Sequence, residues 1–329
     1  MPDRNPSPPP HSPTAHSPTH HSPLHSLSFD IEDWFHIVEV KAVEDPSLWP
    51  GLSARSSLVE RYTDLILRIC DDARVRATFF MLGWIAEKHP ALVQRIAAAG
   101  HELATHSFWH RKVYELTPDV FARDIADSIA AIRAAVPAAD VRGFRAPSFS
   151  ITRGSEWAFD VLLDAGLTYD ASLFPAARGH GGYACTAGPH IVTAPSGRPI
   201  PELPMSIARF GPKKLCYSGG GYMRLLPSAL ISYGLKQEAA QGRGTVVYLH
   251  PRDFATDCPR VPMPPHRAFK CYIGMKHTEA KLRRLLDSAP FTTCRHALQH
   301  ARLLPPDSQT AHAAHHPASP ANGSNPRPV

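Results

Sequence analysis

Two histidines four positions apart are the first residues of this chain whose types and spacing could do chemistry. His106 and His110 stand in the run Thr-His-Ser-Phe-Trp-His, and either one helical turn or a tight loop could direct both imidazoles at a single cation. Two imidazoles with one carboxylate are a common ligand set for zinc and its first-row neighbours, and such a set leaves coordination positions open. The spacing alone is weak evidence, because a chain with 20 histidines produces such pairs readily. A surface pair on a helix is the alternative.

Three acidic residues are candidates for that carboxylate. Asp30, Glu32 and Asp33 follow directly after the apolar stretch 27–29. Carboxylates this close together repel one another unless a cation or an arginine holds them. A solvated loop that caps the following segment would explain the same acids without any function, so the cluster alone leaves both interpretations open.

Three more polar residues follow strand-like segments further along the chain. Arg145 occurs in Gly-Phe-Arg-Ala-Pro-Ser-Phe-Ser, Asp170 comes after residues 167–169, and His250 ends Val-Val-Tyr-Leu-His. Each has an ordinary structural explanation, such as a core arginine paired with a carboxylate or a buried histidine held by hydrogen bonds. Together with the histidine pair and the acids, they provide what metal-assisted hydrolysis of an amide requires: metal ligands, a carboxylate base and a histidine acid.

Strand-like and helix-like segments alternate along the chain, and this alternation predicts a parallel sheet with helical crossovers. Ser57 and Glu60 have the spacing of a capping box at the start of one helix. Because polar residues end at least five strands, we expect a β/α barrel, whose strand ends converge on one face, rather than an open doubly wound sheet. Strands are expected at 27–29, 77–82, 102–104, 141–144, 167–169, 245–249 and 291–293, and helices at 58–69, 85–99, 117–132, 156–165, 227–240, 278–287 and 296–301.

The ends of the chain and one internal stretch differ in composition. Residues 1–26 form a His/Ser/Pro-rich tract and residues 305–329 are similar, so we expect both tails to be disordered. Such segments bury too little apolar surface to offset the entropy of ordering. The folded domain is therefore expected at 27–304, and its Gly- and Pro-rich part at 174–222 is expected to form an irregular insertion over the site.

Composition and charge exclude several other classes of protein. The six cysteines have no CxxC spacing, which argues against a zinc ribbon and fits reduced thiols in a cytoplasm. The net charge is +6, but the basic residues come in short groups rather than one stripe, so no nucleic-acid partner is expected. No run of about 18 apolar residues and no secretory signal is visible, so we expect a cytoplasmic protein without a transmembrane segment.

The order of the motifs resembles a known family, the NodB-homology polysaccharide deacetylases (carbohydrate esterase family 4). Four motifs carry this resemblance: Ser-Phe-Asp-Ile-Glu-Asp at 28–33, Thr-His-Ser-Phe-Trp-His at 105–110, Phe-Arg-Ala-Pro-Ser-Phe-Ser at 144–150 and Leu-His-Pro at 249–251. Glu-Leu-Pro at 202–204 and Gly-Gly-Gly-Tyr-Met-Arg-Leu-Leu-Pro at 219–227 resemble, more narrowly, the exopolysaccharide-locus branch associated with exosortase systems. The resemblance covers about residues 27–302 and implies an α/β fold with a distorted (β/α)7-type barrel.

This resemblance implies a metal site. Asp30 would be the general base that activates a metal-bound water, and His106 and His110 would be metal ligands. Relatives carry two adjacent aspartates as base and ligand, whereas the acids here are spread as Asp-x-Glu-Asp. The third ligand is therefore Asp33 or Glu32, and we favour Asp33, because a longer loop can bring it back to the metal. The implied metal is divalent, zinc first, with cobalt, nickel or manganese as alternatives.

The same resemblance implies roles for the other candidates. Arg145 would orient Asp30 and hold it ionised, and the backbone N–H of Ser148 would join the metal in stabilising the oxyanion. His250 would protonate the departing amine, with Asp170 as its orienting partner. Ser148 replaces a tyrosine that is common in relatives. This replacement leaves the backbone N–H available for the oxyanion but removes a contact that the tyrosine side chain would make with the sugar.

The activity expected from this resemblance is removal of N-acetyl groups from hexosamine units of a polysaccharide or its lipid-linked precursor, with release of acetate. The partner would be an N-acetylated glycan, and a glycan made at the membrane would favour peripheral association with its inner face. Two alternatives stay open: hydrolysis of cyclic amides of the allantoin type, and glycan binding without catalysis.

Overall fold

The computed structural model describes residues 23–38, 40–176 and 182–307. The two tails expected to be disordered lie mainly outside these residues. The first strand begins at His25, two residues before the expected start of the domain. The ring of His25 is buried against Phe291, and its Nδ1 accepts a hydrogen bond from the backbone N–H of Thr245. The folded domain therefore includes residues that composition assigned to the tail.

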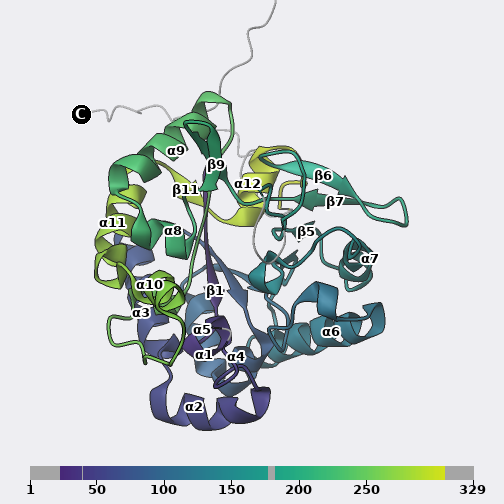
Figure 1. Ribbon diagram of the computed structural model, residues 1–329. Helices are drawn as coiled ribbons and strands as arrows, with labels where there is room; N and C mark the ends of the chain where they lie inside the picture. Colours follow the sequence, from purple (N-terminus) through teal and green to yellow (C-terminus); the bar gives the residue numbers. More distant parts are fainter. Residues whose placement is uncertain (1–22, 39, 177–181, 308–329) are drawn as a thin grey trace, which may run out of the picture.

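One large, curled sheet runs through the molecule (Figure 1). Its strands are β1 (His25–Ile31), β2 (Thr78–Met81), β3 (Glu102–Thr105), β4 (Gly143–Phe144), β5 (Tyr169–Asp170), β6 (His190–Thr193), β7 (Pro199–Glu202), β10 (Val246–Leu249) and β11 (Phe291–Thr292). They lie in the order β10-β1-β2-β3-β4-β5-β7-β6, with β11 paired to the start of β1. Every pair is parallel except β6 with β7. The expected α/β fold of distorted-barrel type is confirmed, and no pairing among the described residues closes the sheet between β6 and β10, so it is a half-barrel.

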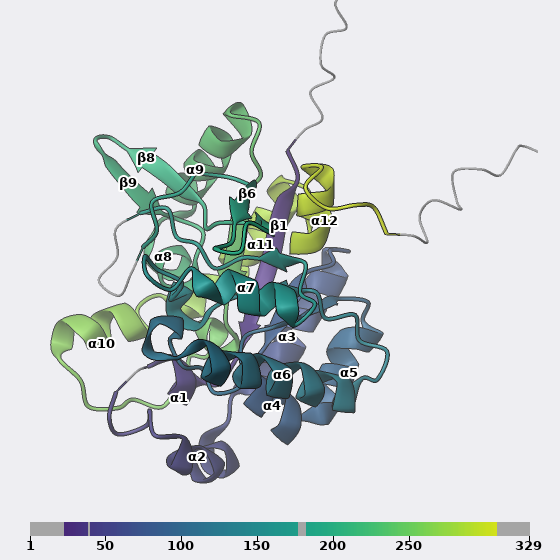
Figure 2. The same ribbon diagram turned by 90° about the vertical axis from the view of Figure 1, so that its right-hand side faces the viewer.

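Helices cover this sheet. They are α1 (Trp34–Ile37), α2 (Trp49–Ser56), α3 (Val59–Asp72), α4 (Gly83–Lys88), α5 (Pro90–Ala98), α6 (Pro118–Ala135), α7 (Trp157–Asp164), α8 (Gly220–Leu225), α9 (Ser228–Ala240), α10 (Pro265–Tyr272), α11 (Thr278–Ser288) and α12 (Cys294–His300). Short 3-10 helices occupy Pro46–Leu48, Val113–Glu115, Pro147–Phe149, Pro251–Phe254 and Met275–His277. Figure 2 shows α7, α6 and α4 packed one below another over one side of the molecule. In the described ranges, no helix has the length and apolar character needed to cross a bilayer.

Local sequence explains most of these elements. All four residues of β2, Thr78-Phe79-Phe80-Met81, are buried, as expected for a strand covered on both faces. The start of α6 is confirmed, because the Thr117 side chain accepts a hydrogen bond from the backbone N–H of Val120 and a proline occupies the first turn. A Cβ at Gly83 would lie 2.8 Å from Cα of Ser128, so the close approach of α4 and α6 requires glycine there.

Two local predictions are wrong. The single helix expected at 85–99 is two helices, α4 and α5, which meet at Pro90, because a proline disfavours helical geometry in the residue before it. Ser57 and Glu60 do not form a capping box, since the hydroxyl of Ser57 donates to the carboxylate of Asp33 instead. The hydrogen bond between Ser57 and Asp33 matters for the site, because it shows where the carboxylate of Asp33 points.

The stretch 174–222 is more regular than expected. It supplies β6 and β7 to the large sheet and forms a hairpin of β8 (Ile207–Phe210) and β9 (Lys213–Cys216), although residues 177–181 lie outside the described chain. The interpretation of the whole stretch as irregular is therefore wrong. The prolines of β7 are tolerated because this strand pairs with β5 only at Glu202, so their missing N–H groups cost no bond on that side.

Candidate active site

The polar residues meet at the carboxyl ends of the parallel strands. Asp30 lies near the end of β1, and His106, Arg145 and His250 directly follow β3, β4 and β10. Carboxyl ends of neighbouring parallel strands share one edge, so residues far apart in sequence come together there. The cavity at this edge has a volume of about 200 Å³ and is lined by Asp30, Glu32, Ile37, His106, His110, Ala146, Ser148, Phe149, Tyr248 and His250.

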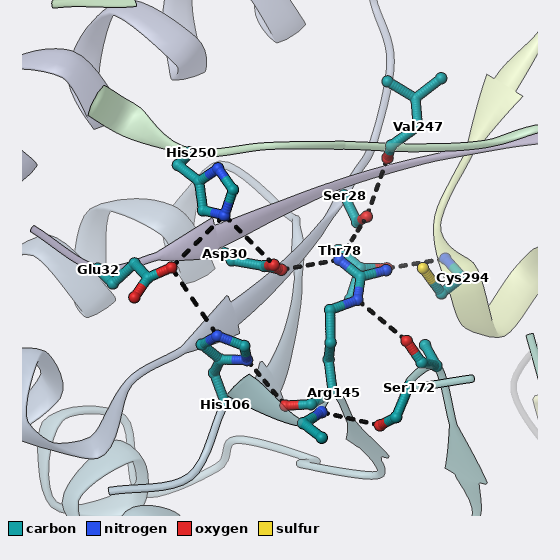
Figure 3. A network of polar contacts seen from close by, with 12 residues as sticks. Ser28, Asp30, Glu32, Thr78, His106, Arg145, Ser172, Val247, His250 and Cys294 are labelled. Atoms are coloured by element: carbon teal, nitrogen blue, oxygen red, sulfur yellow. Dashed lines mark hydrogen bonds and ion pairs between the residues drawn. The ribbon is translucent and has the colours of Figure 1, made fainter. Parts of the chain in front are cut away.

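Glu32, His106 and His110 form a cluster that could hold a metal ion. One potential ligand atom from each residue lies within 4.8 Å of the other two. Oε2 of Glu32 lies 2.7 Å from Nε2 of His110. Oε1 of Glu32 lies 3.9 Å from Nε2 of His106 (Figure 3). The side chains of Glu32 and His106 are each 2% exposed and that of His110 is 9% exposed, so the cluster is shielded from bulk water.

The protonation of His106 shows that this cluster fits a cation. Nδ1 of His106 lies 2.8 Å from the backbone carbonyl oxygen of Arg145, and a carbonyl only accepts, so Nδ1 carries the proton. Burial lowers the pKa of His106 despite the nearby carboxylates of Asp30 and Glu32. The ring is therefore neutral, and its Nε2 presents a lone pair to Glu32. Nε2 of His106 and the carboxylate of Glu32 are thus two acceptors that face each other in a buried space, and a cation between them would satisfy both. The carbonyl of Arg145 fixes the tautomer of His106 through Nδ1.

The preference for Asp33 as the third ligand is wrong, because its carboxylate caps a helix instead. Oδ1 of Asp33 accepts hydrogen bonds from the backbone N–H groups of Trp34 at 2.8 Å and Leu58 at 3.1 Å. Oδ2 accepts a hydrogen bond from the hydroxyl of Ser57 at 2.5 Å. Both oxygens of Asp33 are thus occupied by donors, and the residue does not line the cavity. Glu32, the alternative, lies beside the two histidines.

Asp30 and Arg145 form a buried ion pair. Nη1 of Arg145 donates to Oδ1 of Asp30 at 2.7 Å and to the hydroxyl of Ser28 at 2.9 Å (Figure 3). The guanidinium carbon lies 4.1 Å from the ring centroid of Phe80, which favours a charged arginine. Burial opposes ionisation of Asp30, but Arg145 and then His106 hold its pKa below the ordinary value. Asp30 is therefore an ionised carboxylate beside the metal-ligand cluster.

His250 faces Asp30 and Glu32 from the side opposite His106 (Figure 3). Its Nε2 lies 3.7 Å from Oδ2 of Asp30 and 3.5 Å from Oε1 of Glu32. Behind the ring, Oδ2 of Asp253 accepts hydrogen bonds from Nδ1 of His250 at 3.0 Å and from its backbone N–H at 2.9 Å. Burial alone would lower the pKa of His250, but Asp253 and the two cavity carboxylates raise it to about 9. Sequence reasoning missed Asp253, although an acid three residues after a histidine that begins a 3-10 helix is a usable signal.

The prediction that Asp170 orients His250 is wrong. Oδ1 of Asp170 accepts a hydrogen bond from the hydroxyl of Ser172 at 2.5 Å, and its carboxyl also bonds to Glu202, its cross-strand neighbour on β7. The Ser172 oxygen in turn accepts a hydrogen bond from the backbone N–H of Ala146 at 2.8 Å. Asp170 is absent from the cavity lining and supports the turn that begins at Ala146.

The buried pair of Asp170 and Glu202 predicts a pH dependence of stability. Burial first, and then Asp170, raises the pKa of Glu202 well above its ordinary value. Stability from a group whose pKa is raised by folding is complete below its unfolded pKa, about 4.3 for glutamate, and is lost as the pH rises through the folded value. We expect Glu202→Gln, which keeps the neutral form, to flatten the fall in Tm that the wild type shows as the pH rises above the ordinary titration range of glutamate. Thermal unfolding followed by circular dichroism measures this, and parallel curves of Tm against pH for the two proteins would contradict the raised pKa of Glu202.

Two loops of the site contain strained backbone. Ser107 and His110 have φ values of 66° and 52°, and Ser148 and Phe149 have φ values of 54° and 53°. Positive φ is uncommon for residues other than glycine, and such strain concentrates at functional sites. A tight loop, not a helical turn, therefore directs the two histidines at Glu32. Ser148 lines the cavity, and its backbone N–H as an oxyanion donor stays a prediction.

Two consecutive regions of the chain each match a known family model. Residues 54–169 match the polysaccharide deacetylase family, and residues 171–299 match a domain of unknown function, DUF3473. The chain is 37% identical over 101 residues to a chitooligosaccharide deacetylase of Sinorhizobium fredii (strain NBRC 101917 / NGR234), which covers 31% of this chain and 44% of the relative. It is 38% identical over 64 residues to a peptidoglycan-N-acetylglucosamine deacetylase of Bacillus cereus, which covers 20% of this chain and 23% of the relative. The chain thus spans less than half of the length of these curated relatives.

Two solved structures share the fold over nearly the whole chain. A Mycobacterium smegmatis protein assigned to the polysaccharide deacetylases superposes with a TM-score of 0.56 at 19% identity, over 95% of this chain and 97% of the other. The Puue allantoinase superposes with a TM-score of 0.57 at 15% identity, over 91% and 96%. At these identities the likeness is one of fold alone. By sequence, residues 54–169 are similar to the polysaccharide deacetylase family, and residues 171–299 are similar to DUF3473.

Proposed function

We propose that this protein removes N-acetyl groups from hexosamine units of a glycan and releases acetate, with a divalent metal held by Glu32, His106 and His110. One observation carries the proposal: an ionised aspartate, a metal-ligand cluster and a histidine held by an acid line the same cavity. These are the parts that metal-assisted amide hydrolysis needs. The curated relatives that share part of this sequence are named as deacetylases of chitooligosaccharides and of peptidoglycan N-acetylglucosamine.

Each residue has a task in this reaction. A divalent metal at the cluster would polarise the acetyl carbonyl and lower the pKa of a water molecule. Asp30, kept ionised by Arg145, accepts the proton of the attacking water. The backbone N–H of Ser148 donates to the oxyanion as the carbonyl carbon becomes tetrahedral. His250 then protonates the amine nitrogen as the C–N bond breaks.

We also propose a metal, a substrate and a cellular location for this enzyme. We propose zinc as the metal, because two imidazoles and one carboxylate suit it, with cobalt, nickel or manganese as alternatives. The motifs at 202–204 and 219–227 favour an exopolysaccharide or its lipid-linked precursor as substrate, handled by a cytoplasmic enzyme peripheral to the inner face of the membrane. A panel of acetylated amino sugars and cyclic amides separates this activity from an allantoin-type hydrolase.

The first test is His106→Ala, which removes one proposed ligand. We expect it to lose bound metal and acetate release from N-acetylglucosamine oligomers together, as measured by elemental analysis and an enzymatic acetate assay. His190→Ala is the matched control, because the ring of His190 contacts the carbonyl of Gly188 outside the cavity. All these proteins carry the same histidine-rich N-terminal segment, so a difference in metal content reports on the cavity. Full activity in a metal-free His106→Ala protein would sink the proposal.

A further inference from the structure

The proposed proton donor is held by groups outside the region that matches the deacetylase family. His250 follows β10, and Asp253 follows in the 3-10 helix Pro251–Phe254, so both lie in the DUF3473 region, residues 171–299. Because Oδ2 of Asp253 takes both Nδ1 and the backbone N–H of His250, the ring can face the cavity only with Nε2. This is the orientation that proton donation to a substrate nitrogen requires.

A second ion pair fixes Asp253 itself. Oδ1 of Asp253 lies 2.9 Å from Nε of Arg224, and the two side chains are 4% and 5% exposed. Arg224 belongs to α8 and to the Gly-Gly-Gly-Tyr-Met-Arg run, whose function the sequence left open. A Cβ at Gly220, at the start of the same helix, would overlap the carboxylate of Asp253. The glycine therefore lets α8 approach Asp253 closely enough for the arginine to reach it.

Arg224 is anchored on its other side by α10. Nη1 of Arg224 donates to the backbone carbonyls of Cys271 at 2.6 Å and Ile273 at 3.3 Å, and Nη2 donates to that of Lys270 at 3.3 Å. These carbonyls lie at the end of the helix, where they have no partner within it. The guanidinium thus has a fixed position between the end of α10 and Asp253.

We propose that Arg224 is a positioning residue that acts through Asp253 to hold His250 as the proton donor, and that supplying this acid half of the site is a function of the DUF3473 domain. The inference rests on the proposed deacetylase function. In the step concerned, the C–N bond breaks, its electron pair stays on nitrogen, and the proton on Nε2 of His250 moves to that nitrogen. Without Arg224, Asp253 is a buried charge with reduced compensation, and its Oδ1 loses the group that holds it in place.

This role predicts a loss that depends on the leaving group. An amide needs a proton on its departing nitrogen, whereas the 4-nitrophenolate of 4-nitrophenyl acetate leaves without one. We expect Arg224→Ala to lower kcat for N-acetylglucosamine oligomers by about 10²-fold or more, within the usual range for acid catalysis. KM and metal content should stay close to the wild-type values, and ester hydrolysis should fall by a much smaller factor. Arg224→Lys, which keeps the charge, and added guanidinium with Arg224→Ala should each recover part of the amide activity.

Two further variants separate this role from a general loss of stability. Arg243→Ala is the matched control, because it breaks another arginine–carboxylate pair in the same region, with Glu238, away from the cavity. Gly220→Ala keeps Arg224 but crowds Asp253, and it should reproduce the amide-selective loss in a protein of unchanged metal content. Equal losses on amide and ester without rescue, or unchanged amide turnover in Arg224→Ala, would overturn the inference. A wild-type protein that releases no acetate would instead contradict the proposed function on which it rests.

Discussion

Replacing Glu32 with glutamine should remove the metal and the activity together. Glu32 is the only carboxylate in the described chain grouped with both His106 and His110 as a potential ligand set, and the amide of glutamine is a much weaker ligand than a carboxylate. We expect metal content to fall from about one ion per chain to a small fraction and acetate release to fall by about 10³-fold or more. Elemental analysis and the acetate assay on the same preparations measure both quantities.

Asp33→Asn is the matched control for this prediction. It changes the adjacent acid in the same way, but at a residue that caps α1 and binds Ser57 and Leu58. We expect it to keep its metal and most of its activity, and to lower the free energy of unfolding by about 1–2 kcal/mol, as the loss of a helix cap does. The opposite pattern, with metal lost from Asp33→Asn and retained in Glu32→Gln, would restore the preference drawn from the sequence.

Replacing Asp30 with asparagine should lower kcat strongly while leaving the metal in place. Asp30 is held by Arg145 rather than by the histidine pair, so its loss removes a proton acceptor and no ligand. We expect kcat to fall by about 10²- to 10⁴-fold, the usual contribution of a general base. Steady-state kinetics and metal content are measured side by side, with Asp160→Asn as a control at a surface ion pair with Arg198. Loss of metal from Asp30→Asn would identify Asp30 as a ligand, and an unchanged kcat would remove it from the mechanism.

The sequence predicted which side chains meet, because the carboxyl ends of parallel strands lie at one edge of a sheet. Asp30, His106, Arg145 and His250 each stand at or just after the end of an apolar strand, and the parallel sheet brings these ends to one edge. The roles that the sequence assigned to these side chains stay predictions until they are measured. Their meeting in one cavity is what the structure adds.

The choice between Glu32 and Asp33 could have been made from the sequence. Successive side chains of an extended segment point to opposite sides, so Asp30 and Glu32 share a side and Asp33 does not. The structure agrees with this alternation: the hydroxyl of Ser57 bonds to Asp33, on the side away from the cavity, and does not cap α3. The error came from treating three neighbouring acids as a flexible loop.

The support of His250 could be predicted only in part. Asp253 lies three residues after it, within reach of a local rule, but Arg224 precedes it by 26 positions on a separate helix. That contact depends on how α8 packs against the 3-10 helix after β10, and no spacing in the sequence encodes it. Asp170 was chosen because it also ends a strand, but its carboxyl is bonded to Ser172 and Glu202.

In the proposed function, one metal site in this cavity hydrolyses the amide of an acetylated amino sugar. The most direct measurement is acetate release from N-acetylglucosamine oligomers by the full chain, before chelation, after chelation and after zinc is added back. We expect acetate release by the untreated protein, loss of release on chelation, and recovery with about one zinc ion per cavity. None of these should be seen with Glu32→Gln. Acetate release that persists in the chelated protein, or none from a zinc-loaded protein, would contradict it.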